Sequence, residues 1–165
     1  MNKTQTVIKV GIADVNLVKK PENIRTSGLG SCVGVVVYDA KAGLAGLAHI
    51  LLPDSSMARQ KDINIYKYAD TALPYLIDSL IKKGASPDRL KAKMAGGAQM
   101  FQFSSQSNMM RIGPRNIEAV RGILHEYHIP VVAHDVGGNA GRTIEFDTNM
   151  NKLKIRKINE KEFLI

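Results

Sequence analysis

The chain of 165 residues contains no tryptophan and one cysteine, Cys32. One cysteine excludes an internal disulfide and any metal centre built from several thiolates, and we expect neither a metal site nor a cofactor. No apolar run approaches the roughly 20 residues of a membrane-spanning helix, and no signal-peptide core follows the first residues. These absences predict a cytoplasmic protein without membrane insertion.

The formal net charge is +8, and the basic residues are scattered apart from a cluster at 152–157. A basic surface attracts acidic partners in general. Because the sequence lacks an aromatic RNA-binding motif, we do not expect nucleic acid as a partner. The length suits one domain with its own core, spanning residues 1–165.

Hydrophobic patterning predicts about seven strands and two main helices. Pro74 lies inside the first helical segment, so this helix either kinks there or begins near Thr71. The helices are too few for a doubly wound sheet, and the strands come in hairpins. We therefore expect an α+β fold with helices on a mainly antiparallel sheet or sandwich. Strand patterns lie at 6–10, 14–19, 33–38, 44–52, 89–94, 129–136, 142–147 and 152–158, and helical patterns at 63–83 and 114–128.

A glycine-rich stretch from Thr26 to Cys32 is predicted to be a loop that leads into the valine-rich strand 33–38. The next apolar run carries His49, and a short polar segment ending in glycine joins the two runs, which is typical of a β-hairpin. Pairing in this hairpin makes Cys32 and His49 opposite or diagonal neighbours, with Cβ atoms roughly 5–8 Å apart. A slip of one residue would place them on opposite faces.

A cysteine beside a histidine suits nucleophilic catalysis, because the imidazole can take the thiol proton and pair with the thiolate. Thr26 is a candidate third residue that holds the imidazole. Backbone N–H groups of the loop could stabilise an oxyanion, which indicates acyl transfer at an amide or ester. The alternative is a free cysteine that is only a small buried hydrophobe. The candidate oxyanion and substrate loop consists of Ser27, Gly28, Gly30 and Ser31.

A second candidate feature is an apolar group within the polar segment 99–110. It includes Phe101 and Phe103, which could pack in the core or bind a partner protein.

These residues resemble a known family, the chemoreceptor glutamine deamidases of bacterial chemotaxis, or CheD family. The resemblance is carried by the stretch from Thr26 to Val35 and by Gly46-Leu47-Ala48-His49. It continues through 67–70, 96–101, 112–116 and 135–138 and covers nearly the whole chain.

The resemblance implies a hydrolase that converts glutamine side chains of methyl-accepting chemotaxis receptors to glutamate and releases ammonia. It implies Cys32 as nucleophile, His49 as base and Thr26 as third triad member, in a fold similar to the catalytic domain of cytotoxic necrotizing factor toxins. It also implies binding and stimulation of a CheC-type CheY-phosphate phosphatase, and in some members receptor methylesterase activity. The alternative is an adaptor that binds receptor and phosphatase without chemistry.

Overall fold

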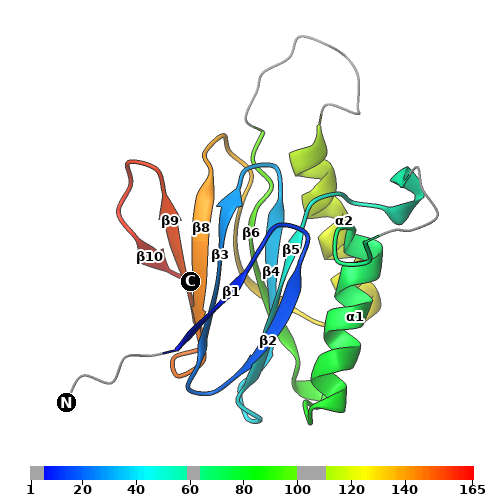
Figure 1. Cartoon of the computed structure of the whole chain (residues 1–165), viewed down its shortest axis with the longest axis vertical. Helices are drawn as coiled ribbons and strands as arrows, with labels where there is room; N and C mark the ends of the chain where they lie inside the picture. The colour runs from blue at the N-terminus through cyan, green and yellow to red at the C-terminus, as the bar shows by residue number, and fades with distance from the viewer. Residues whose placement is uncertain (1–5, 59–63, 100–110) are drawn as a thin grey trace.

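The computed structural model describes residues 6–58, 64–99 and 111–165, and within them ten strands form two five-stranded sheets. Two α-helices cover one of the sheets (Figure 1). Sheet 1 has the order β1 (Val7–Val10), β3 (Asn23–Leu29), β8 (Arg142–Asp147), β9 (Lys152–Lys157), β10 (Phe163–Leu164). Sheet 2 has the order β2 (Val15–Lys19), β5 (Leu44–Ile50), β4 (Val33–Asp39), β6 (Lys91–Gly96), β7 (Val131–Val136). The helices are α1 (Ala69–Lys82) and α2 (Ile112–Glu126), with short 3-10 turns at Ser55–Met57 and Pro87–Arg89.

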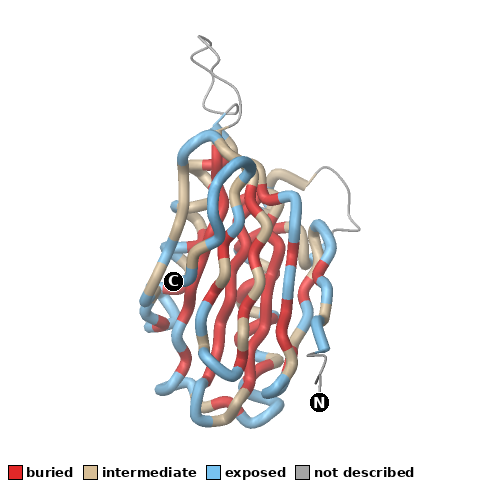
Figure 2. Tube along the Cα trace, turned by 90° about the vertical axis from the view of Figure 1, so that its left-hand side faces the viewer, coloured by how far each residue is buried: buried red, intermediate tan, exposed pale blue. Residues whose placement is uncertain are grey.

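Sheet 2 is the middle of three layers, between sheet 1 and the two helices (Figure 1). Its central strands β4 and β5 are buried along their whole length, as the tube in Figure 2 shows. Strands covered on both faces need apolar side chains on both, which explains their continuous apolar sequences.

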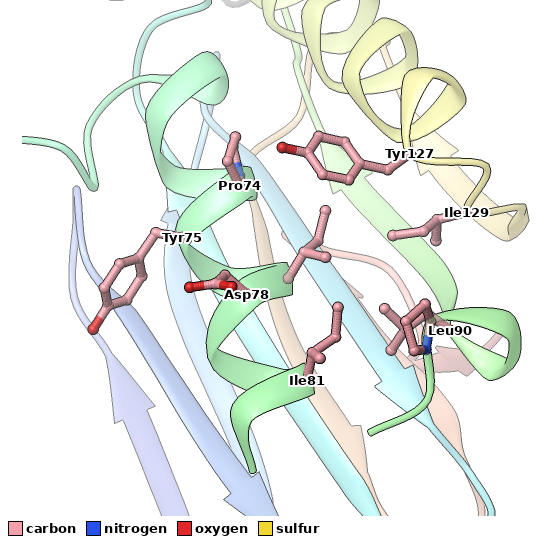
Figure 3. Close-up of a pocket in the computed structure, with 9 residues that line it drawn as sticks. Pro74, Tyr75, Asp78, Ile81, Leu90, Tyr127 and Ile129 are labelled. Atoms are coloured by element: carbon pink, nitrogen blue, oxygen red, sulfur yellow. The ribbon is translucent and has the colours of Figure 1, made fainter. Parts of the chain in front are cut away.

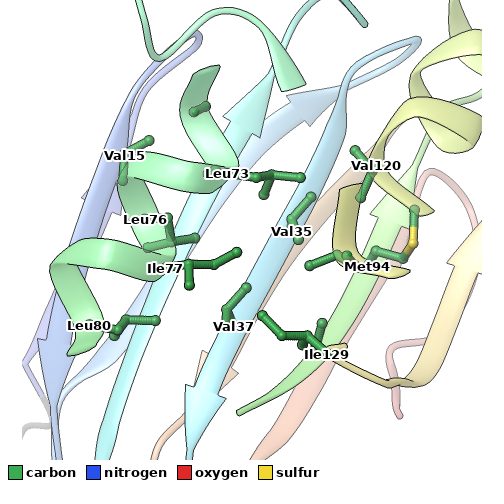
Figure 4. Close-up of a cluster of buried hydrophobic side chains, with 14 of the residues drawn as sticks. Val15, Val35, Val37, Leu73, Leu76, Ile77, Leu80, Met94, Val120 and Ile129 are labelled. Carbon is green, nitrogen blue, oxygen red and sulfur yellow. The ribbon is translucent and has the colours of Figure 1, made fainter. Parts of the chain in front are cut away.

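Alternate side chains of β4 therefore serve two different cores. Val35 and Val37 point toward Leu73 of α1 and Val120 of α2, in the helix-side core of Figure 4. Val36 packs instead in the core between the sheets, which also contains Cys32, Leu29, Leu47, Ile144 and Phe146.

The predicted α+β class is confirmed, and most strand pairs are antiparallel as expected, although both sheets are mixed. β1 pairs with β3 and β6 with β7 in parallel, while the other pairs are antiparallel. The loop predicted from Thr26 to Cys32 is wrong up to Leu29, because β3 lies between β1 and β8 and both neighbours supply its ladder. The two-residue strand β10 was also missed.

The helices differ from their predicted bounds. The described residues 64–68 are not α-helical, so the longer, kinked helix is wrong, and α1 begins two residues before Thr71 with Pro74 inside it. Asn116 of α2 lies on the buried face of the helix, while Tyr127, just after the helix ends, is 44% exposed. In the described parts of the chain, no helix is long and apolar enough to cross a membrane.

Candidate active site

Thr26 of β3 and His49 of β5 join the two sheets through a side-chain hydrogen bond. The Oγ1 atom of Thr26 lies 2.7 Å from Nδ1 of His49 and donates to the carbonyl oxygen of Val10, also at 2.7 Å. A hydroxyl has one proton, and a carbonyl can only accept. Thr26 therefore accepts from Nδ1–H, and the lone pair of the neutral imidazole lies on Nε2.

The Nε2 atom of His49 is buried and has no hydrogen-bond partner among the residues that the structure describes. The ring is fully buried, and this burial lowers the pKa of His49 to about 4. At neutral pH the side chain is therefore an uncharged imidazole whose free lone pair can accept a proton.

Cys32 lies on the same face of sheet 2 as His49. In the β4–β5 ladder His49 pairs with Gly34, so Cys32, two residues earlier, is its diagonal neighbour and the predicted hairpin relation is confirmed. Gly34 lets sheet 1 approach closely here. A Cβ atom at this position would lie 2.6 Å from Cδ1 of Ile144 and 3.6 Å from Cγ2 of Thr26.

The Cys32 side chain is only 6% exposed. Burial raises the pKa of its thiol, and a hydrogen bond from the backbone N–H of Cys32 itself offsets part of that effect. The sequence suggested a thiolate paired with an imidazolium. Burial instead favours a neutral thiol beside a neutral imidazole, because both charged forms lose hydration.

The predicted oxyanion loop divides into two parts. Ser27 and Gly28 are exposed and lie at a β-bulge between Thr26 and Leu29, where Gly28 has a φ of 73°. Gly30 and Ser31 are half-buried, and the N–H of Gly30 already donates to the carbonyl of Gly28 at 3.1 Å. The N–H of Cys32 lies in the same residue as the thiol and offsets part of the rise in its pKa.

Sequence reasoning missed Asn116, which contacts this loop from the first turns of α2. Its Nδ2 atom donates to the carbonyl oxygens of Ser31 and Leu51, each at 3.0 Å, and its side chain is fully buried. A signal was present in the sequence. Asn116 precedes Val120 and Leu124 at four-residue steps, which places an amide on the apolar face of the helix.

Other candidates lie elsewhere. Phe101 and Phe103 are outside the described residues. No group of three or more His, Cys, Asp or Glu side chains in the described ranges is arranged to hold a metal ion.

An apolar groove between α1 and the end of α2 contains none of the site residues (Figure 3). It is lined by Pro74, Tyr75, Ile77, Asp78, Ile81, Pro87, Leu90, Tyr127 and Ile129.

Curated relatives match almost the whole chain. A probable chemoreceptor glutamine deamidase CheD of Oceanobacillus iheyensis is 58% identical over 160 residues, covering 97% of this chain and 96% of the relative. The chemoreceptor glutamine deamidase CheD of Halalkalibacterium halodurans is 56% identical over 156 residues, with 94% and 96% covered. The Bacillus subtilis protein of that name is 49% identical over 163 residues, with 98% of each chain covered.

The family model described as CheD chemotactic sensory transduction matches residues 51–157. The matched range includes Asn116 and begins just after His49, while the alignments to the relatives extend over nearly all of the chain. The chain belongs to the CheD family.

Proposed function

We propose that this protein hydrolyses glutamine side-chain amides of chemoreceptors to glutamate, with Cys32 as nucleophile, His49 as general base and Thr26 as the residue that orients the imidazole. The names of the relatives state this activity for those proteins. One observation carries the proposal. His49 is held as the Nδ1–H tautomer, so its unpartnered Nε2 can accept a proton on the sheet face where Cys32 lies.

Because the Cys32 thiol and the His49 imidazole are both neutral at rest, the proton should move from sulfur to nitrogen as the sulfur attacks. The Sγ atom of Cys32 attacks the carbonyl carbon of the glutamine amide while Nε2 of His49 takes the thiol proton. The backbone N–H of Cys32 stabilises the oxyanion of the tetrahedral intermediate. The C–N bond then breaks as Nε2–H protonates the leaving nitrogen, so ammonia departs and a thioester remains.

A water molecule completes the cycle. It gives a proton to Nε2 as its oxygen attacks the thioester carbonyl, and the C–S bond breaks to leave glutamate. The imidazolium returns its proton to the sulfur. Throughout, Thr26 accepts from Nδ1–H and keeps Nε2 directed at the reacting atoms.

We further propose binding of a CheC-type CheY-phosphate phosphatase, and the family resemblance is what supports it. The exposed residues Ser27 and Gly28 would face the substrate, while Phe101 and Phe103 would contribute to partner binding. We also propose a cytoplasmic location, where both partners would act, and a single domain over residues 1–165. An adaptor role without chemistry is the competing function.

The direct test is mass analysis of a purified receptor cytoplasmic domain after incubation with the protein. Wild type should convert specific glutamines to glutamate, and Cys32→Ala should abolish conversion while pull-down of receptor and phosphatase persists. Conversion by Cys32→Ala would refute the assignment of the nucleophile. A wild-type protein that binds receptor but converts no glutamine would favour the adaptor role.

A further inference from the structure

Three successive carbonyl groups before β4 accept hydrogen bonds from two residues that follow β6 and from one side chain of α2. The carbonyl of Gly30 accepts from the N–H of Ala98 and that of Cys32 from the N–H of Gly97, each at 2.8 Å. The carbonyl between them, on Ser31, accepts from Nδ2 of Asn116. The backbone at the nucleophile is thus held at three successive carbonyls, two of them bonded to main-chain N–H groups and one to a side chain.

Asn116 bridges the point where the β4–β5 ladder ends. The ladder pairs Val33 with Ile50, and just beyond it the carbonyls of Ser31 and Leu51 both accept from Nδ2 of Asn116. Two acceptors cannot bond to each other, so an NH₂ group between them satisfies both. This fixes the amide orientation, because the flipped amide would turn Oδ1 toward two carbonyl oxygens.

Glycines allow α2 to approach closely enough for this short side chain to reach. A Cβ atom at Gly113, in the first turn of α2, would lie 2.4 Å from the carbonyl oxygen of Ala98. One at Gly97, where φ is +68°, would lie 2.4 Å from Cγ1 of Ile117. Figure 1 shows the start of α2 and the β3–β4 connection at the same end of the molecule.

We propose that Asn116 is a positioning residue that orients the backbone N–H of Cys32 as an oxyanion donor by holding the carbonyl of Ser31. In a trans peptide the C=O and N–H groups point in opposite directions. A Ser31 carbonyl held by Asn116 therefore also fixes the direction of the Cys32 N–H, which points the opposite way within the same peptide plane. That N–H belongs to the same residue as Sγ, the atom that attacks.

The Oδ1 atom of Asn116 is buried and has no partner among the described residues. An unpaired buried acceptor is destabilising, so an apolar residue would suit the inward face of α2 better for packing alone. The two N–H donors of Asn116 account for an amide at this position. The inference rests on the proposed function, because an oxyanion donor matters only where Cys32 attacks a carbonyl.

The experiment compares two electrophiles that label Cys32 without any receptor. With iodoacetamide the sulfur displaces iodide from a saturated carbon, and no oxyanion forms. p-Nitrophenyl acetate reacts at its carbonyl carbon: the thiol proton passes to Nε2 of His49, the sulfur forms a thioester, the ester C–O bond breaks, and p-nitrophenolate leaves. In Asn116→Leu the acetylation rate should fall about 100-fold and the alkylation rate less than about 3-fold, because only acetylation uses the oxyanion donor.

Val120→Ala is the matched control, since it truncates a fully buried apolar side chain one turn further along α2. It should lower Tm and leave the ratio of the two rates unchanged. If Asn116→Leu does not fold, Asn116→Ser replaces it, because the smaller side chain leaves room for a water between the two carbonyls. A smaller fall in the ratio, still above that of the control, is expected there.

An unchanged ratio, or equal losses in both rates, would overturn the inference, since it would show that Asn116 acts on the fold or on the thiol itself. Receptor conversion by wild type is measured in parallel. Failure of wild type to convert receptor glutamines, with the ratio still falling in the variant, would refute the proposed substrate and leave the role of Asn116 standing.

Discussion

The two ends of β4 hold buried polar groups in opposite ways. At its C-terminal end the fully buried carboxylate of Asp39 has every oxygen paired. Oδ1 accepts from the N–H of Ala42 at 3.1 Å and from Nε of Arg89 at 3.0 Å. Oδ2 accepts from the N–H of Ser86 and pairs with Nη2 of Arg89, each at 2.9 Å. This end has the pattern of a structural anchor.

At the other end of β4 two buried atoms, Nε2 of His49 and Oδ1 of Asn116, have no partner in the described residues. Each unpaired buried polar atom costs about 1–3 kcal/mol, so native structures keep few of them. Both lie at the end of the strand where Cys32 is found. The comparison teaches that unsatisfied groups mark the reactive end, while saturated groups mark the end that stabilises the fold.

The largest expected effect is on catalysis at the reactive end. His49→Gln should lower the rate of receptor glutamine conversion about 1,000-fold, because an amide cannot act as a general base. Rates are measured by peptide mass analysis with saturating receptor. Asp39→Asn serves as the control and should retain the wild-type rate. A His49→Gln protein with wild-type turnover would show that the free Nε2 has no catalytic role.

The pH dependence of stability should also separate the two ends. Burial lowers the pKa of His49 from 6.5 to about 4, so the unfolded chain binds the extra proton between these values. The stabilisation of the folded state that depends on an uncharged His49 should be complete above pH 6.5. It should fall by roughly 3 kcal/mol as the pH drops to about 4.

Denaturant unfolding of wild type and His49→Gln at a series of pH values checks this. The difference between the two curves isolates His49 from the carboxylates that titrate nearby. Parallel curves from pH 7 to pH 4 would contradict the assignment of a buried neutral imidazole.

Thr26→Val removes the hydroxyl that holds the imidazole while keeping the volume of the side chain. We expect kcat to fall about 100-fold with little change in KM, because the ring loses its fixed tautomer and orientation. Thr26→Ser keeps the hydroxyl and should retain most of the activity. Equal activity of the two variants would mean that the 2.7 Å contact to Nδ1 does not orient the base.

The smallest effect is expected at the C-terminal end of β4, where Asp39 contributes to stability. Burial by itself would raise the pKa of Asp39, but hydrogen bonds from Arg89, Ser86 and Ala42 hold it at about 2. Asp39→Asn should lower the free energy of unfolding by about 2 kcal/mol at pH 7, a figure reduced for the solvent exposure of Arg89. The contribution should be complete above pH 3.8 and vanish as the pH falls through about 2. Unchanged stability at pH 7 would show that this end is not an anchor.

Sequence reasoning succeeded where the determinants are local. A hairpin pairs residues that are close in the chain, so the relation between Cys32 and His49 followed from turn position and alternation. The hairpin of β8 and β9 followed in the same way. The apolar runs of β4 and β5 were recognised as strands because the short polar segment that joins them, ending in glycine, is typical of a hairpin.

Sequence reasoning failed where distant segments supply the bonds. β3 reads as a loop because Ser27 and Gly28 interrupt it, yet β1 and β8 enclose it and turn Thr26 inward. Thr26 was named as a candidate from the sequence, but its contact with Nδ1 depends on the packing of one sheet on the other. Asn116 lies 85 residues from Ser31, so nothing local linked them.

By itself, then, the sequence determined the family, the α+β class and the pairing of one cysteine with one histidine, since each follows from motifs or from periodicity within a few residues. Only the tertiary structure decided the protonation states of that pair, because desolvation depends on everything packed around Cys32 and His49. It also decided the tautomer of His49 and the contact of Asn116 with the nucleophile peptide. Both arise from hydrogen bonds between elements that meet only when the sheets and α2 have packed together.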